Sequence, residues 1–126
     1  MPTDDRPTAR TVVPAALADL VCVVLFCTLG RRSHGEGLDL AGIAQTTWPF
    51  LTGTAVGWLA TRAWRRPAAI APTGLVVWVA TIAVGMLLRK LTGGGVAGSF
   101  VLVASTVTAV LFLGWRAIAA LAARRR

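Results

Sequence analysis

One carboxylate lies inside a long uncharged stretch of this sequence. Asp19 is the only charged residue between positions 11 and 30. An ionised group at the centre of a membrane helix costs about 2.5–3.5 kcal/mol on insertion scales, so Asp19 is expected to face other helices as a candidate proton or cation relay. The alternative is a polar clasp between helices. Its expected partners, at similar depth, are the indole of Trp78 and the hydroxyls of Thr54 and Thr108.

A second polar group borders two short segments at which uncharged runs end. Its members are Arg31, Arg32, Ser33, His34, Arg89 and Lys90. If the two segments meet, their basic side chains form a rim that attracts an anionic lipid or a small anion, because arginine binds phosphate and carboxylate through paired hydrogen bonds. The alternative is that these residues only end the helices at the membrane surface and pair with Glu36, Asp39 and lipid headgroups.

Metal and cofactor chemistry finds little support. His34 is the only histidine of the chain, and no cysteine stands near it at the spacing of metal ligands. Cys22 and Cys27 are rotated by about 140° from one another on a helix, so we expect them to pack as small apolar side chains. Ser33 beside His34 lacks the geometry of a nucleophile and its base. We therefore predict no metal, no cofactor and no catalytic residue.

The composition indicates the environment in which these residues act. Of 126 residues, 56% are hydrophobic and 14% are charged, whereas soluble domains carry roughly 25% charged residues. The net charge of +8 comes from residues that separate long uncharged runs, while a nucleic-acid module places its basic residues on a polar fold. The sequence predicts a protein of the lipid bilayer that binds no nucleic acid.

The uncharged runs predict an all-α fold, a four-helix transmembrane bundle. About 20 apolar residues at 1.5 Å each cross the hydrocarbon core of roughly 30 Å, and transmembrane strands would be only about ten residues long. The expected domain covers residues 12–120, between a disordered tail at 1–11 and a basic tail at 121–126. Its helices are expected at about 12–30, 40–62, 72–90 and 96–118.

The second run carries two further signals. Pro49 has no amide hydrogen, so the carbonyl of Gln45 loses its usual partner and a kink is expected there. Gly53 and Gly57 form a small-residue face that lets another helix approach closely. Trp58 lies at the end of the run, as expected for an aromatic belt at the membrane interface.

The positions of the basic residues predict the orientation. Nine of the thirteen fall on the side of the two termini and of the loop at 62–66, and four fall on the other side. By the positive-inside rule, both termini of this multi-pass plasma-membrane protein are expected in the cytoplasm.

The two halves of the chain share landmarks, which suggests a tandem repeat of two helices. Arg31 and Arg89 stand 58 residues apart, and Trp58 and Trp115 stand 57 apart, each after a glycine. Because each unit has two spans, its copies are expected in the same orientation, related by an axis along the membrane normal.

Several of these residues carry a resemblance. Asp19, followed after ten residues by Gly30-Arg31-Arg32-Ser33-His34, combines with Trp48-Pro49-Phe50, Leu88-Arg89 and Gly114-Trp115-Arg116. This combination resembles a family of small bacterial and archaeal integral membrane proteins classed as a domain of unknown function. The resemblance extends over about residues 13–116. It implies a four-helix membrane protein and no particular activity.

Two hypotheses of function follow from the sequence. The first is a small transporter-like or channel-like protein, expected to be oligomeric, which uses Asp19 and the basic rim. The alternative is a non-catalytic membrane binding or assembly subunit, which holds a protein or lipid partner through the face of Gly53 and Gly57 and the outer loop. An enzyme that acts on lipid is the third and least supported possibility.

Overall fold

The computed structural model describes residues 9–33 and 35–125, and within them every regular element is helical. Four long helices are α1 (Ala9–Ser33), α2 (Leu40–Thr61), α3 (Leu75–Leu91) and α4 (Gly98–Arg124). Two short turns, η1 (Ala63–Arg65) and η2 (Ile70–Gly74), connect α2 to α3. The predicted all-α fold with four helices is confirmed.

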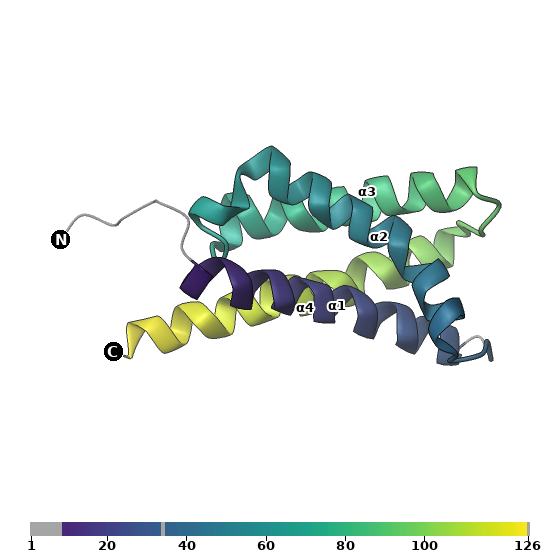
Figure 1. Ribbon diagram of the computed structural model, residues 1–126, viewed down its shortest axis with the longest axis horizontal. Coiled ribbons are helices and arrows are strands. Elements are labelled where there is room, and N and C mark those ends of the chain that lie inside the picture. Colours follow the sequence, from purple (N-terminus) through teal and green to yellow (C-terminus); the bar gives the residue numbers. More distant parts are fainter. Residues whose placement is uncertain (1–8, 34, 126) are drawn as a thin grey trace.

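The helices form two antiparallel hairpins that pack side by side (Figure 1). The start of α1, the end of α4 and the α2–α3 connection lie at one end of the bundle, which we call the terminal end. The tight turns that follow α1 and α3 lie at the opposite end, the turn end. In sequential order around the bundle, α1 contacts α2, α2 contacts α3, α3 contacts α4 and α4 contacts α1.

Three stretches are long and apolar enough to cross a bilayer: Arg10–Ser33, Ile70–Leu91 and Gly98–Arg124. Helix α2 has 22 residues and no charged side chain, but it contains Gln45 and five threonines and is not among these three stretches. It packs most extensively against α3. The protein is therefore a helical membrane protein, and among the described residues three of its long helices meet the length and hydropathy of a membrane span.

The helix ends differ from the expected bounds. Residues 9–11 and 121–124 were expected in tails, but they continue α1 and α4. Residues 1–8 of the expected N-terminal tail lie outside the described residues. The alanines around Arg116 favour helix, which explains why α4 runs past that charge.

Helix α2 runs unbroken through Pro49. Figure 1 shows that it changes direction in its N-terminal half, the part that contains Gln45 and Pro49. The side chain of Gln45 is exposed, whereas Pro49 is buried.

The glycine face of α2 is occupied inside the chain. A Cβ atom on Gly53 would lie 2.6 Å from the carbonyl oxygen of Ala80, and one on Gly57 would lie 2.7 Å from the Cα atom of Val77. Helix α3 thus packs directly on the α2 backbone. The hypothesis that this face holds a separate partner is wrong, because α3 already covers it.

The two tight turns have matching backbone hydrogen bonds. The Glu36 amide donates to the Arg31 carbonyl at 2.8 Å, and the Gly94 amide donates to the Arg89 carbonyl at 2.7 Å. Gly35 and Gly93 both have positive φ angles, of 69° and 89°, a conformation that glycine adopts without steric cost. All three pairs of equivalent residues stand 58 apart, so the spacing seen in the sequence recurs in three dimensions.

Candidate functional site

A buried ion pair joins the first helix to the last. Asp19 on α1 and Arg116 on α4 are 1% and 0% exposed. The two terminal nitrogens of the guanidinium donate to the two carboxylate oxygens, Nη1 to Oδ1 at 2.9 Å and Nη2 to Oδ2 at 2.8 Å. This is the bidentate geometry in which arginine and carboxylate bind most strongly.

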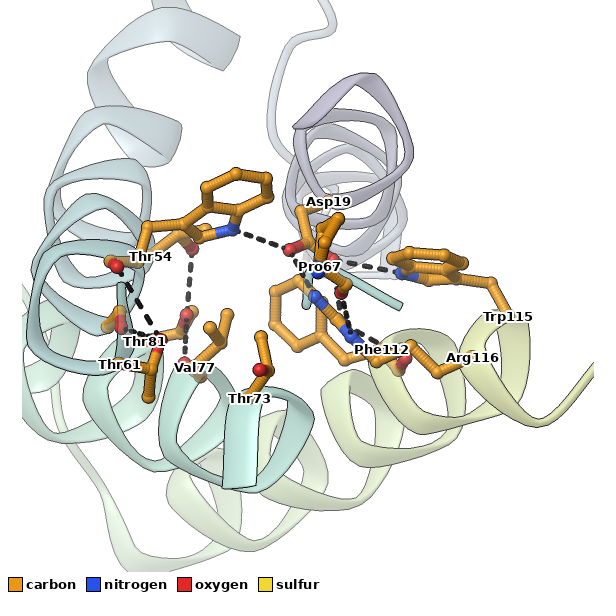
Figure 2. A network of polar contacts seen from close by, with 12 residues as sticks. Asp19, Thr54, Thr61, Pro67, Thr73, Val77, Thr81, Phe112, Trp115 and Arg116 are labelled. Carbon is orange, nitrogen blue, oxygen red and sulfur yellow. Dashed lines mark hydrogen bonds and ion pairs between the residues drawn. The ribbon is translucent and has the colours of Figure 1, made fainter. Parts of the chain in front are cut away.

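Two tryptophans complete the coordination of the carboxylate. The Trp58 indole N–H donates to Oδ2 of Asp19 at 2.8 Å, and the Trp115 indole N–H donates to Oδ1 at 2.9 Å. Figure 2 shows Trp115 and Arg116 reaching Asp19 from the same helix. Each oxygen therefore accepts two hydrogen bonds. We call Asp19, Arg116, Trp58 and Trp115 the Asp19 cluster.

Arg116 makes two further hydrogen bonds, both to backbone carbonyls. Its Nε donates to the carbonyl of Pro67 at 3.0 Å and its Nη1 to the carbonyl of Phe112 at 3.3 Å. The guanidinium carbon lies 4.4 Å from the centre of the Trp115 ring, within range of a cation–π interaction. Gly74 leaves room for the side chain, since a Cβ there would lie 2.9 Å from Cδ of Arg116.

The Asp19 cluster is suited to holding helices together. It joins α1, α2, α4 and the α2–α3 connection through one carboxylate, and the opposite charges are paired and hydrogen-bonded in the interior, as a buried ion pair requires. A relay must release its proton or cation, whereas this carboxylate is bound by four donors. The geometry therefore favours the clasp over the relay.

The expected partners of Asp19 bond elsewhere. The indole N–H of Trp78 donates to the carbonyl of Ser105 at 3.0 Å, and the hydroxyl of Thr108 donates to the carbonyl of Ala104 at 2.6 Å. Thr54 and Thr81 share a hydrogen bond between their hydroxyls at 2.7 Å. The expected partners were wrong in depth, since Thr54 precedes Trp58 by one helical turn and Thr108 precedes Arg116 by about two.

Arg116 was missed because it was taken as the end of a membrane span. The signal that could have found it is the apolar segment that follows, residues 117–123, which contains no charge. That segment places Arg116 well inside the helix, at a depth that an acidic residue on another helix could match.

We expect Trp58→Phe to lower the stability of the bundle by about 1.5–3 kcal/mol, because it removes a hydrogen bond to a charged group. Reversible denaturation in mixed micelles would measure the loss. Trp48→Phe is the matched control, since Trp48 is 43% exposed on the same helix and should tolerate the change. Equal effects of the two substitutions would count against a specific role of the Trp58 bond.

At the turn end, Arg31 and Arg89 hold their own turns. Nε of Arg31 donates to the carbonyl of Gly37 at 2.6 Å, and Nε of Arg89 donates to that of Gly95 at 2.7 Å. These bonds match residue for residue, again 58 positions apart. Each arginine thus closes a turn in its own hairpin.

Arg31 makes two more contacts than Arg89 with polar side chains. Its Nη1 lies 2.9 Å from the hydroxyl of Thr46 and 3.1 Å from the carboxylate of Glu36. The Arg89 guanidinium instead lies over the ring of Phe100, with its carbon 4.8 Å from the ring centre. Within the described part of the chain, Arg31 thus forms an ion pair with Glu36, whereas no ion pair of Arg89 is seen.

The structure brings Arg31 and Arg89 to one small cavity of about 20 Å³, room for about one water molecule. Arg32, Ser33 and Lys90 are exposed at the surface. The sixth residue of the predicted rim, His34, lies outside the described residues. The rim residues that are described therefore divide into two inward arginines and three surface side chains.

A larger groove lies beside this cavity, between α1 and α4. Its volume is about 430 Å³, within the range of small-molecule sites. It shares Phe26, Gly30 and Phe100 with the cavity of the two arginines. The other residues that line this turn-end groove are Leu29, Ser33, Ala97, Ser99, Val103, Ala104 and Val107.

A second groove between the same helices lies toward the terminal end. Its volume is about 630 Å³, and it is lined by apolar side chains together with Pro14 and Gly114. Within residues 9–33 and 35–125, no group of three or more His, Cys, Asp or Glu side chains is placed to hold a metal ion.

The protein belongs to the class of helical membrane proteins. Its two hairpins have apolar outer surfaces, and a buried ion pair joins them inside. The chain belongs to one family of that class, described as a protein of unknown function, DUF3054, whose model matches residues 16–119. The match includes both Asp19 and Arg116, and it confirms the predicted membership in a family of unknown function. No curated protein and no solved structure matches the chain.

Proposed function

We propose that this protein is a non-catalytic membrane protein that binds an anionic lipid in the turn-end groove. The observation that carries the proposal is the continuity between an apolar groove and two arginines. The groove and the cavity of Arg31 and Arg89 share three lining residues. An acyl chain in the groove would place its phosphate beside those guanidinium groups.

The chemistry of the groove suits such a ligand. Phe26 and Phe100 offer apolar surface to an acyl chain, and Gly30 and Ala97 keep the space between the helices open. Within the described part of the chain, Arg89 uses Nε for its turn and its terminal nitrogens can donate to a phosphate. Arginine binds phosphate through two such nitrogens at once.

The proposal includes an orientation in the membrane. Arg116 is buried against Asp19, so it does not count as a surface charge. The terminal side then retains eight basic residues against four at the turn end. This excess favours a multi-pass protein of the plasma membrane with both termini in the cytoplasm, so that the groove faces the outer leaflet.

A test compares lipid binding by two variants that fill different grooves. Gly30 and Gly114 both have no heavy atom within 4 Å of an added Cβ, so a side chain can begin at either position without a backbone clash. We expect Gly30→Leu to weaken binding of phosphatidylglycerol at least fivefold in native mass spectrometry of the purified protein. Gly114→Leu should leave it unchanged, because Gly114 lines the terminal-end groove.

Two results would overturn the lipid assignment. One is equal binding of phosphatidylglycerol and phosphatidylcholine by the unaltered protein, since the arginines would then contribute no selectivity. The other is undiminished phosphatidylglycerol binding by folded Gly30→Leu protein. Arg89→Gln should lower the selectivity for the anionic lipid while leaving the groove itself intact.

Transport is the second candidate function. In its favour, the Asp19 cluster joins the helices in the terminal half of the bundle, and the turn-end groove lies in the other half. Two repeated hairpins in one orientation also occur in transporters. The cavity of the two arginines holds only about 20 Å³, so a path for solutes would need a second copy or another membrane protein. Proteoliposomes with no anion flux above that of empty vesicles would remove this candidate.

A further inference from the structure

A basic hollow at the terminal end is independent of the groove. Helix α2 ends at Arg62, which has a left-handed conformation with φ 51° and ψ 54°. The turn η1 follows at once, and the Arg65 amide donates to the Arg62 carbonyl at 2.9 Å. Only a few per cent of residues other than glycine adopt a positive φ, so the chain holds Arg62 in an uncommon conformation.

The hollow has a volume of about 260 Å³. Six residues line it: Thr61, Arg62, Arg65, Arg66, Pro72 and Thr73. The Thr73 hydroxyl donates to the Arg66 carbonyl at 2.9 Å, and the Thr61 hydroxyl donates to the Gly57 carbonyl at 2.8 Å. The walls are therefore fixed by hydroxyl and backbone hydrogen bonds, and the guanidinium groups of Arg62 and Arg65 are exposed at the mouth.

Among the described residues, the charged side chains that line the hollow are all arginines. The sequence contains no Asp or Glu after Asp39, so α2, the connection, α3 and α4 offer no carboxylate to Arg62 and Arg65. The buried carboxylate of Asp19 is already bound by Arg116 and two tryptophans. Within residues 9–33 and 35–125, the guanidinium groups of Arg62 and Arg65 are therefore placed to accept an anionic ligand.

We propose that the hollow binds the phosphate group of an anionic phospholipid. Guanidinium groups three residues apart can donate to separate oxygens of one phosphate. The hollow lies where the apolar helices α2 and α3 end, which is the depth of lipid headgroups if both helices span the membrane. Its volume exceeds that of a bare phosphate ion and leaves room for the glycerol part of a headgroup.

The test measures binding of short-chain phosphatidylglycerol to the full chain in mild detergent at fixed ionic strength. The full chain is expected to bind this lipid at two sites, the turn-end groove and the hollow. We expect Arg62→Gln/Arg65→Gln to weaken binding at the hollow at least fivefold. Arg124→Gln/Arg125→Gln is the matched control, because it removes the same charge from the same end of the bundle. The control variant should bind within twofold of the unaltered protein.

Several outcomes would overturn the assignment. Equal weakening in both double variants would show a general attraction to the basic end, and no weakening in the first would place the lipid elsewhere. Displacement of the lipid by millimolar inorganic phosphate would assign the hollow to free phosphate. If the double variant fails to fold, Arg65→Gln alone should still weaken binding, and unchanged binding by that variant counts against the site.

The Gly30→Leu variant separates this inference from the proposed function. That substitution fills the turn-end groove, far from the hollow, so binding at the hollow should persist in it. Loss of the groove site with a retained hollow supports both assignments. Lipid binding at the groove without binding at the hollow would contradict the inference about the hollow and leave the proposed function unaffected.

Discussion

Replacing Arg116 by alanine should destabilise the bundle by about 3–5 kcal/mol, the cost of breaking a buried ion pair from one side. Asp19 would remain 1% exposed with no cation beside it. Only the hydrogen bonds from the indoles of Trp58 and Trp115 would then stabilise its charge. Reversible unfolding in mixed micelles measures the effect, and much of the variant is expected to be unfolded on purification.

The matched variants decide whether charge is the cause. Arg125→Ala removes an exposed arginine just past α4 and should change little. The double variant Asp19→Leu/Arg116→Met should recover most of the stability, because apolar residues of similar volume often replace a buried pair without loss. A double variant as unstable as Arg116→Ala would contradict this account and point to lost packing instead.

The second large effect is expected at the contact of α2 with α3. Gly53→Ala should destabilise the bundle by about 1–3 kcal/mol, since added volume in a well-packed contact displaces the backbone. The new Cβ would lie 2.6 Å from the Ala80 carbonyl oxygen and 2.8 Å from the Cα of Thr81. Neither backbone atom can move without shifting the helix to which it belongs.

Gly114→Ala is the control for that substitution. A Cβ on Gly114 meets no heavy atom within 4 Å, and alanine favours helix over glycine by up to about 1 kcal/mol. Its stability should be equal to or slightly above that of the unaltered protein. Similar losses at both positions would mean that helix flexibility, and not the close approach of α3, is the reason for glycine at Gly53.

Much of the architecture follows from the sequence because it depends on local composition. Uncharged runs of about 20 residues fix the number and order of the helices, and the glycines after Arg31 and Arg89 fix where the chain turns. Helix ends are less certain, since Arg124 can follow six alanine-rich residues without ending a helix. In α4, helix propensity decided the boundary and the charge of Arg116 did not.

The sequence predicts that Asp19 needs a polar partner, but it does not predict which residue that partner is. A lone carboxylate in an apolar run requires a partner from another helix, and Asp19 indeed has one. Which helix turn supplies that partner depends on how far the helices slide past one another. Thr54 and Thr108 lie on the same helix faces as Trp58 and Arg116. The predicted faces were therefore correct, but the predicted axial register of the helices was wrong.

The basic rim illustrates a different limit. The spacing of Arg31 and Arg89 indicated that they are equivalent, and the structure places both at one cavity. Sequence spacing contains no information on side-chain hydrogen bonds, so it could not show that each Nε closes a turn. Likewise, the spacing of Gly53 and Gly57 predicts a close helix contact, but it does not predict which helix makes that contact.

The ion pair between the first and last helices also depends on the order of synthesis. Asp19 and Arg116 are 97 residues apart, so at about 5–20 residues per second the nascent chain waits on the order of 5–20 seconds for its cation. Until α4 has been made, the carboxylate has only the indole of Trp58 from the first hairpin. The ion pair therefore forms only after Arg116 has been synthesised, and any chain truncated before Arg116 retains an unmatched acid in its membrane interior.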